Sequence, residues 1–300
     1  MSISQRRIKV IYNPTAGGRS RRRLAIALKA LKQHAKKVKL SPTKYAGHGI
    51  KRADKALNRK TKKPYDIVCA AGGDGTIAEV ANGMRGSDSP LLVLPLGTAN
   101  VFARELGLGT SMRKISAMVE TLGEKRVYAG MFGDKRFIMM ASAGIDSLAV
   151  AALDSNLKRR IGAAAYVVAA FKAVKRMKDL DLNVTVDGDE YKTANVIVTL
   201  GRLYGGSFVI SPNADLENPV FHVVMMKNTG FWAAMKYGLA LATNRLPYLD
   251  DVVITSGTHV TIDSEKSIPF QVDGDDGGLL PVDLRIDDQP LTVLAPTQKG

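Results

Sequence analysis

The first half of the chain alternates between short apolar runs and longer segments in which apolar residues recur with helical spacing. The apolar runs are rich in β-branched residues and bounded by glycine, proline or polar residues, which is typical of buried strands. Such alternation predicts a parallel sheet with helices on both faces. We expect strands at residues 6–13, 38–43, 65–70 and 90–96, and helices at 20–37, 48–60, 76–84 and 98–106.

Three of the loops that follow these expected strands combine glycine with polar residues. They are NPTAGG at residues 13–18, GGDGT at 72–76 and PLGTAN at 95–100. Ligands of parallel sheets bind at the carboxyl ends of the strands, which lie together at one edge. We therefore expect the three loops to contribute to one binding site.

The loop at residues 72–76 lies where an apolar strand gives way to a helix. Glycine lets the main chain approach a ligand closely, and the N–H groups at a helix start attract anions. The spacing fits neither the dinucleotide fingerprint nor the P-loop, since no lysine follows the glycines. The acid within the loop, Asp74, indicates that a cation or a hydroxyl also approaches. We interpret the loop as a phosphate-binding one; a tight turn without a ligand is the alternative.

From about residue 130 the pattern changes to short strands separated by turn residues, many with alternating polar and apolar side chains. This pattern predicts an antiparallel β-sandwich, and the pair Asp187-Gly188 marks a hairpin tip. Two helical stretches, at residues 155–178 and 231–244, interrupt the strands. We expect a boundary near Tyr128. The predicted domains are an α/β nucleotide-binding domain at 1–128 and a β-rich substrate domain at 129–300.

The chain is strongly basic, with 43 lysines and arginines against 28 aspartates and glutamates and a formal net charge of +15. Residues 19–39 contain nine bases and no acid, and residues 51–63 contain seven bases and one acid. A basic helix face attracts anionic lipid headgroups or nucleic acid, although a solvated surface is the simpler explanation. No aromatic residues accompany the bases as a nucleic-acid platform requires, so no specific nucleic-acid partner is expected.

The single cysteine, Cys69, falls in an expected central strand and is interpreted as a buried small residue. One cysteine permits no disulfide within the chain, which agrees with a cytoplasmic location. The longest uncharged apolar run, at residues 161–171, is too short to span a bilayer, and we expect no signal peptide. The four histidines form no motif with serine or cysteine, so a hydrolytic triad has no support.

The segments NPTAGG, GGDGTIAEVANG and PLGTANVFARELG, in this order and at this separation, resemble bacterial lipid kinases related to diacylglycerol and sphingosine kinases. The second half continues the resemblance with SAGIDS, GGSFVISPNADLENPVF and FQVDGDD. GGDGT alone also occurs in NAD kinases, but its extension through Glu79 and the GTAN segment followed by Phe102 are more specific to the lipid kinases. The resemblance implies an α/β nucleotide domain and a β-rich domain with the active site in the cleft between them.

The resemblance also implies ATP-dependent phosphorylation of a lipid hydroxyl. Backbone amides and hydroxyls would donate to the phosphate oxygens, and Asp74 would face the γ-phosphate directly or through Mg²⁺. The residues implied in nucleotide binding are Asn13, Pro14, Thr15, Ala16, Gly17, Thr43, Gly72, Gly73, Asp74, Gly75, Thr76, Glu79, Gly97, Thr98 and Asn100.

The acceptor hydroxyl must lose its proton as the new bond forms. The family pattern there is Asp-Gly-Glu, with the acid proposed as base, and the matching residues are Asp273, Gly274 and Asp275. The implied catalytic residues are therefore Asp275, Asp273 and Asp74. Asp275 keeps the carboxylate but is about one methylene shorter than glutamate. A hairpin turn is the alternative for these residues.

A second, peripheral Mg²⁺ site of the family corresponds to Leu216, Asn218 and Val220. Asn218 stands where the family has an aspartate. Because carboxylates are the main Mg²⁺ ligands that a protein offers, we expect this site to be weak.

The implied partner is a lipid substrate at an anionic membrane surface, reached by peripheral association with the inner membrane face. The alanine-rich helix near Ala163 and the helix at 230–242 either present residues such as Phe231 and Trp232 to that interface or are core helices. Relatives are compatible with a homodimer. An NAD kinase-like enzyme and a nucleotide- or lipid-binding protein without catalysis are the alternatives.

Overall fold

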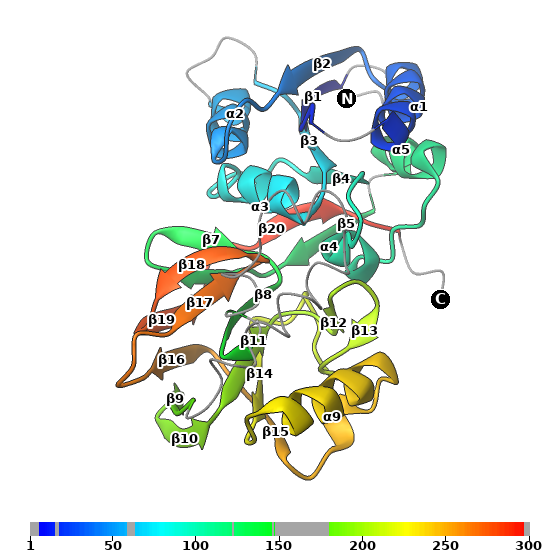
Figure 1. The fold of residues 1–300 in the computed structure, drawn as a ribbon. Coiled ribbons are helices and arrows are strands. Elements are labelled where there is room, and N and C mark those ends of the chain that lie inside the picture. Colours follow the sequence, from blue (N-terminus) through cyan, green and yellow to red (C-terminus); the bar gives the residue numbers. More distant parts are fainter. Residues whose placement is uncertain are drawn as a thin grey trace. The chain divides into compact units, whose positions relative to one another are not determined.

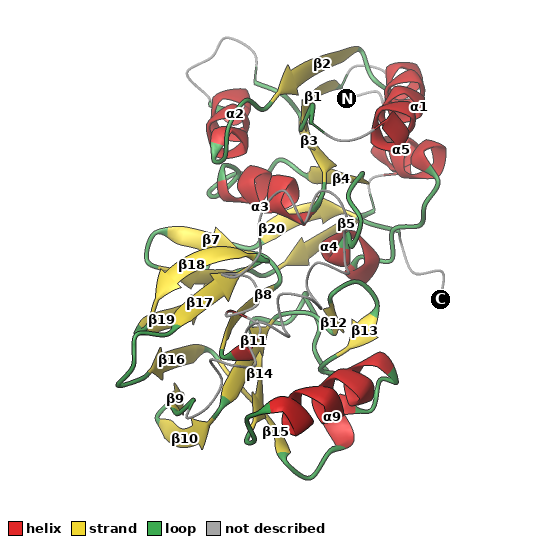
Figure 2. Cartoon of the chain, in the orientation of Figure 1, coloured by secondary structure: helices red, strands yellow, loops and turns green. Residues whose placement is uncertain are grey.

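The computed structural model describes residues 6–15, 18–58, 64–121, 123–145, 147 and 180–296. The chain divides into two compact units, which Figures 1 and 2 show as ribbons. The first unit comprises Met1–Tyr128 and Asp288–Gly300, and the second comprises Ala129–Asp287. The second domain was expected to run to residue 300. It ends earlier because the last strand of the chain pairs within the first unit.

The first unit is built on a six-stranded sheet in the order β2-β1-β3-β4-β20-β5. The first five strands in this order run parallel to their neighbours, and β5 runs antiparallel to β20. The strands are β1 (Arg7–Tyr12), β2 (Lys37–Pro42), β3 (Ile67–Gly72), β4 (Leu91–Pro95), β5 (Glu124–Val127) and β20 (Leu291–Leu294).

Helices follow each of the first four strands, as the alternation predicts. They are α1 (Gly18–His34), α2 (His48–Leu57), α3 (Asp74–Asn82), α4 (Val101–Glu105) and, beyond the alternation, α5 (Met112–Thr121). The helix expected at 98–106 is shorter, because Asn100 adopts a left-handed conformation with φ 48° and ends the preceding loop. The sequence prediction missed α5, which packs against α1 and buries Met112, Ile115 and Val119.

The core of the first unit centres on β3 and β4, in which every residue is buried. Strands covered by helices on both faces have this property, and their sequences read as continuous apolar runs. Cys69 is fully buried in β3, which confirms its predicted place, and burial raises the pKa of its thiol. This cysteine is therefore a packing residue and not a nucleophile.

The second unit contains two six-stranded antiparallel sheets, which confirms the predicted change to β structure. Their orders are β10-β9-β16-β19-β6-β7 and β15-β14-β11-β8-β17-β18. The ring centroids of Phe132 on β6 and Phe270 on β17 lie 5.9 Å apart, and those of Phe137 on β7 and Phe221 on β14 lie 5.8 Å apart. Because each pair joins one sheet to the other, the two sheets pack face to face as a sandwich.

The strands of the sandwich are short and are separated by turns. They are β6 (Gly130–Phe132), β7 (Lys135–Phe137), β8 (Met140–Ala143), β9 (Leu182–Val186), β10 (Asp189–Thr193), β11 (Asn195–Thr199), β14 (Phe221–Met226), β15 (Val252–Gly257), β16 (His259–Asp263), β17 (Pro269–Val272), β18 (Asp275–Leu279) and β19 (Val282–Ile286).

Further elements lie beside the sandwich. They are the small hairpin β12 (Leu203–Tyr204) and β13 (Phe208–Val209), the helix α9 (Phe231–Ala242) and the 3-10 helix η2 (Leu246–Tyr248). The helix expected at 155–178, with Ala163, lies outside the described residues. In the described ranges, no helix has the length and apolar character needed to cross a membrane.

Candidate functional site

The loops after β1, β2, β3 and β4 leave the same edge of the first sheet, because these four strands are adjacent and parallel. This edge therefore brings together four loops. Three were singled out in the sequence, at 13–18, 72–76 and 95–100, and the fourth is the loop at 43–47 between β2 and α2. The Thr43 N–H donates to the carbonyl of Tyr12 at 2.9 Å, which ties the loops after β2 and β1 to each other. We call these four segments the carboxyl-edge loops.

The loops after β3 and β4 touch through their backbones. The Leu96 N–H donates to the Gly72 carbonyl at 2.8 Å. A Cβ on Gly97 would lie 2.6 Å from the Cα of Gly73, closer than a real Cβ approaches another carbon. Glycine at residue 97 is therefore required by the approach of the two loops.

Gly73 is also the N-cap residue of α3, with extended backbone and no side-chain hydrogen bond to the helix. The first N–H groups of an α-helix have no partner within the helix, and its N-terminus carries a partial positive charge. Gly75 and Thr76 belong to this first turn and are half-buried. Chemically, the start of α3 is thus suited to hold phosphate oxygens, as predicted for this loop.

Asp74, the first residue of α3, faces the start of α4. Its Oδ1 accepts the backbone N–H of Phe102 at 3.2 Å. Burial raises the pKa of the Asp74 carboxyl, and backbone hydrogen bonds from Val101 and its neighbours oppose that rise. The structure therefore gives this carboxylate a capping role at α4, in addition to the phosphate role expected from the sequence.

Glu79 fastens the loop before α2 to α3. Its Oε1 accepts the Gly47 N–H and its Oε2 accepts the Gly49 N–H, each at 2.7 Å. The fit is close, since a Cβ on Gly49 would lie 2.6 Å from Glu79 Oε2. Both carboxylate oxygens of Glu79 therefore hold the loop. This residue was predicted to bind the nucleotide, and the structure shows it supporting a neighbouring loop.

The loop after β4 is closed by the side chain of Asn100. Its Oδ1 accepts the Gly97 N–H at 2.9 Å, and its Nδ2 donates to the Gly97 carbonyl at 2.8 Å. The Asn100 amide thus shapes the loop, whereas Thr98 between the two residues is exposed. Of the residues predicted here, Thr98 is the one that offers an exposed hydroxyl to a ligand.

The loop after β1 begins with a turn closed by Asn13. The Asn13 Oδ1 accepts the Thr15 N–H at 3.0 Å and the Thr15 hydroxyl at 2.7 Å. Pro14 and Thr15 are exposed. The next two predicted residues, Ala16 and Gly17, lie outside the described residues.

In the second unit, Asp273 and Gly274 form the tip of the hairpin between β17 and β18. Their φ angles are 50° and 84°, the positive pair that a two-residue type I′ turn requires. The Asp273 carboxylate accepts three backbone N–H groups, from Ile138 at 2.8 Å, Met139 at 2.9 Å and Met140 at 3.0 Å. Asp273, which was predicted as catalytic, therefore uses its carboxylate to position the turn.

Asp275 follows this turn as the first residue of β18 and is exposed. A buried pair behind the turn was not foreseen. Gln271 Oε1 accepts the Gly274 N–H at 2.7 Å, and Gln271 Nε2 donates to the Ser142 hydroxyl at 2.8 Å. A glutamine within the apolar strand pattern at residues 268–272 was the available signal. Together the contacts of Asp273 and Gln271 fix the backbone that presents Asp275.

The loop predicted as a peripheral Mg²⁺ site is a hydrogen-bonded turn. The Asn218 N–H donates to the Asp215 carbonyl at 3.0 Å, and the Val220 N–H donates to the Asn218 carbonyl at 2.9 Å. Leu216 is buried and Asn218 is exposed. Across the part of the chain that the structure describes, no group of three His, Cys, Asp or Glu side chains could hold a metal ion. A Mg²⁺ role for this loop stays a prediction.

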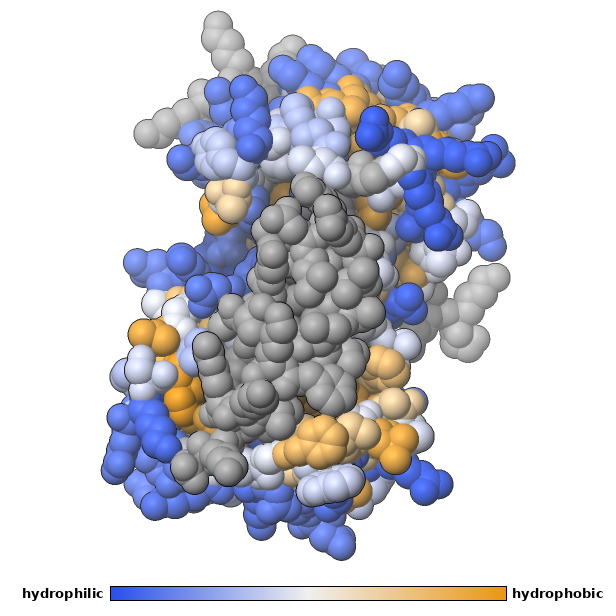
Figure 3. Space-filling view, viewed as in Figure 1, coloured by the Kyte–Doolittle hydropathy of each residue, from blue (hydrophilic) through white to orange (hydrophobic). Residues whose placement is uncertain are grey.

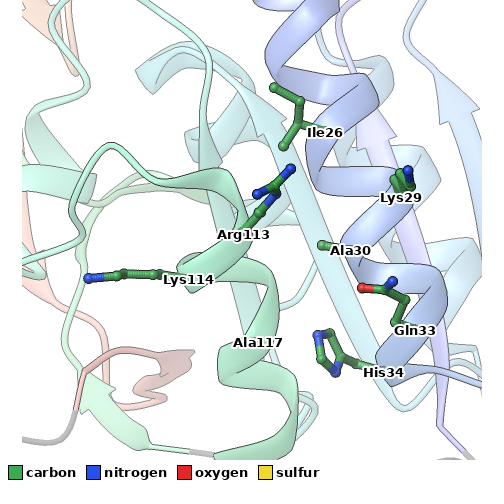
Figure 4. Close-up of a pocket in the computed structure, with 8 residues that line it drawn as sticks. All are labelled: Ile26, Lys29, Ala30, Gln33, His34, Arg113, Lys114 and Ala117. Atoms are coloured by element: carbon green, nitrogen blue, oxygen red, sulfur yellow. The ribbon is translucent and has the colours of Figure 1, made fainter.

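A cavity of about 570 Å³ lies between α1 and α5 (Figure 4). Its lining combines basic side chains, including Lys29, Arg113 and Lys114, with apolar ones such as Ile26. Figure 4 shows Arg113 directed toward α1 and Lys114 directed away from it. The cavity is lined by the second half of α1, whereas the carboxyl-edge loop at 13–18 leads into the first turn of that helix. None of the predicted site residues lines it.

Comparison with known proteins assigns both halves of the chain. Residues 7–131 match the diacylglycerol kinase catalytic domain, and residues 139–295 match the YegS C-terminal NAD kinase beta sandwich-like domain. Diacylglycerol kinases of Staphylococcus aureus strains MRSA252 and Newman are each 28% identical to this chain over 299 residues, covering 97% of this chain and 93% of the relative.

Solved structures from Bacillus anthracis str. Sterne share the fold. One, described as a diacylglycerol kinase, superposes with a TM-score of 0.76 at 20% identity and covers 97% of each chain. Another superposes with a TM-score of 0.79 at 20% identity, covering 99% of this chain and 97% of that chain. The family expected from the sequence motifs is confirmed: the chain belongs to the diacylglycerol kinase family of phosphotransferases.

Proposed function

We propose that this protein is an ATP-dependent lipid kinase, which transfers the γ-phosphate of ATP to a hydroxyl of a diacylglycerol-like lipid. The observation that carries the proposal is the contact of the two glycine loops at Gly73 and Gly97, beside the start of α3. Gly73 caps α3 without a side-chain hydrogen bond to the helix, and the first N–H groups of a helix have no partner within it, which suits a triphosphate. Family membership supplies the kinase class.

The nucleotide would lie against the carboxyl-edge loops. The donors that we propose are the first-turn N–H groups at Gly75 and Thr76, with the exposed hydroxyl of Thr98. Asn100 shapes the loop that carries Thr98, while Glu79 and the Asn13 turn hold the neighbouring loops through backbone N–H groups. In phosphoryl transfer the protein contributes mainly positioning and charge stabilisation, so loops held by such contacts suit the reaction.

Kinases bind ATP together with Mg²⁺, which neutralises negative charge on the phosphates. Mg²⁺ in such sites is held by the phosphates, by water and by one or two carboxylates. Glu79 uses both of its oxygens for backbone N–H groups. Asp74 is therefore the carboxylate of the carboxyl-edge loops that we propose as the protein's ligand to the metal.

We propose Asp275 as the base. The acceptor hydroxyl oxygen forms a bond to the γ-phosphorus while the bond from that phosphorus to ADP breaks, and the hydroxyl proton passes to the Asp275 carboxylate. Asp273 positions this group and does not compete for the proton, because its carboxylate accepts three backbone N–H groups.

We propose that the protein is located in the cytoplasm and reaches its substrate at an anionic membrane surface. The basic residues of α1 and α2 support this, since Arg21, Arg22, Lys29, Lys51 and Lys55 are all exposed. Their attraction to anionic lipid would be screened by salt, so vesicle binding should weaken as ionic strength rises. A homodimer is compatible with this proposal.

The test is phosphate transfer from labelled ATP, with Mg²⁺, to a panel of hydroxyl-bearing lipids in anionic vesicles and to NAD. Transfer to a diacylglycerol-like lipid supports the proposal and names the substrate. Transfer to NAD alone would replace it with the NAD kinase alternative. ATP binding without transfer to any acceptor would favour a binding protein that lacks catalysis.

A further inference from the structure

The helix α9 turns an apolar face outward. Phe231 is 42% exposed, Trp232 81%, Met235 48% and Leu239 68%. At about 100° per residue these four positions fall within about 100° of the helix circumference, so their side chains share one face. We call this group the α9 apolar face. Figure 3 shows it as hydrophobic surface at the position that α9 has in Figure 1.

The opposite face of α9 holds the helix to the second unit. Tyr237 and Ala240 are its buried residues. The Tyr237 hydroxyl donates to Asp251 Oδ2 at 2.8 Å and accepts the Asn228 N–H at 3.1 Å, while Lys236 Nζ donates to Asp251 Oδ1 at 2.7 Å. These contacts fix the rotation of the helix, so the exposure of the α9 apolar face is part of the fold. The sequence left open whether α9 is a core helix, and these exposures decide against that.

Charges around α9 are arranged to suit an anionic surface. Lys236 is the charged residue of the helix, which has no acid. Exposed bases flank it at both ends, Lys227 before the helix and Arg245 after it. Of the two neighbouring acids, Asp251 is paired with Lys236 and with Tyr237, and Asp250 is exposed. The apolar face thus has a mainly basic border, the pattern of an interfacial helix.

Elements in contact with α9 add exposed aromatic residues. The Val209 N–H of β13 donates to Asn244 Oδ1, just beyond the helix, at 2.8 Å. Phe208 on β13 is 37% exposed, and Tyr248 on η2 is 73% exposed. Tryptophan and tyrosine favour the boundary between headgroups and acyl chains.

We infer that the α9 apolar face inserts into the interfacial layer of a lipid bilayer that contains anionic lipid. The four side chains expose on the order of 500 Å², which is less than the roughly 800 Å² per partner that a stable dimer buries. A bilayer needs no such matched surface, and basic flanking residues favour anionic headgroups. The α9 apolar face is thus where the second unit meets the membrane, whichever lipid is phosphorylated.

The chain provides its own probe, because Trp232 is its one tryptophan. The full-length protein is mixed, without ATP, with vesicles of phosphatidylcholine alone or with phosphatidylglycerol added. We expect Trp232 emission to move to shorter wavelength with the anionic vesicles, and brominated acyl chains to quench it. Leu239→Asp keeps the probe and should weaken vesicle binding at least tenfold.

The matched control is Leu40→Asp on β2, an exposed leucine of the first unit, which should bind vesicles as the unaltered protein does. Circular dichroism and thermal unfolding check that both variants fold. Unchanged Trp232 emission with anionic vesicles, or equal binding by Leu239→Asp, would overturn the inference. The inference would also be overturned if the protein had the mass of a dimer and Trp232 were already shielded from solvent before vesicles are added. Transfer to lipid dispersed in detergent tests the proposed kinase activity separately, since it needs no bilayer.

Discussion

Gly73 and Gly97 approach so closely that a Cβ on Gly97 would lie 2.6 Å from the Cα of Gly73. Gly97→Ala should therefore separate the loops after β3 and β4 and move the start of α3. We expect a loss of about 1–3 kcal/mol in the free energy of unfolding, the usual range for overpacking, and at least tenfold weaker ATP binding. Urea unfolding and calorimetric titration with ATP measure the two effects.

Gly109→Ala serves as its control, because a Cβ at Gly109 meets nothing within 4 Å. This variant should match the unaltered protein in stability and in ATP affinity. If Gly97→Ala also left ATP affinity unchanged, the contact between the loops would have no part in nucleotide binding.

Glu79 should act through the loop that it holds. Glu79→Ala removes the acceptors of the Gly47 and Gly49 N–H groups and should cost about 2–3 kcal/mol of stability. Glu79→Gln keeps one acceptor oxygen and should recover part of that loss. Thermal unfolding and the KM for ATP are measured together for both variants, with the exposed Glu190→Ala as control. A raised KM at unchanged stability would instead show direct contact with the nucleotide.

Asp251 should make stability depend on acid pH. Burial opposes its ionisation, but hydrogen bonds from Lys236, Tyr237 and Asn228 outweigh this and lower its pKa to about 2. Because the folded-state pKa is below the ordinary value of 3.8, the ionised form stabilises the fold above pH 3.8, and this stabilisation is lost as pH falls toward 2. The shift corresponds to about 2 kcal/mol at neutral pH.

Asp251→Asn tests this by urea unfolding at pH 7 and pH 3. The difference in stability from the unaltered protein should be about 2 kcal/mol at pH 7 and about half of that at pH 3. Asp250→Asn, at the exposed neighbouring residue, should show little difference at either pH. An equal effect of Asp251→Asn at both pH values would contradict the ionised network.

Much of the fold was predictable because local patterns and chain order agree. Four strand–helix pairs of the first unit and the strands of the sandwich follow from periodicity. The placement of β20 was not predictable, because its short apolar run pairs with β4 and β5, far away in the sequence. Helix α5 was missed although its buried residues Met112, Ile115 and Val119 recur with helical spacing, which was the available signal.

The loops that form the candidate site could be predicted from the sequence, but the hydrogen bonds within and between them could not. The glycine motifs identified the carboxyl-edge loops, but the capping roles of Asp74 and Glu79 depend on which backbone N–H groups the fold brings near. The segments at 186–190 and 272–276 show the same limit, since both read Val-Asp-Gly-Asp followed by an acid. Both form turns with positive φ at Asp and Gly, and only the motif resemblance separates them.

These two turns provide the most direct test of the account. Asp275 and Asp189 are both exposed and both follow an Asp-Gly turn as the first residue of a strand. Transfer of labelled phosphate from ATP to diacylglycerol is measured for Asp275→Asn and Asp189→Asn, with thermal unfolding alongside. We predict that Asp275→Asn lowers kcat at least a hundredfold at unchanged stability, whereas Asp189→Asn transfers phosphate normally. Equal activity of the two variants would contradict the proposal that Asp275 takes the proton from the lipid hydroxyl.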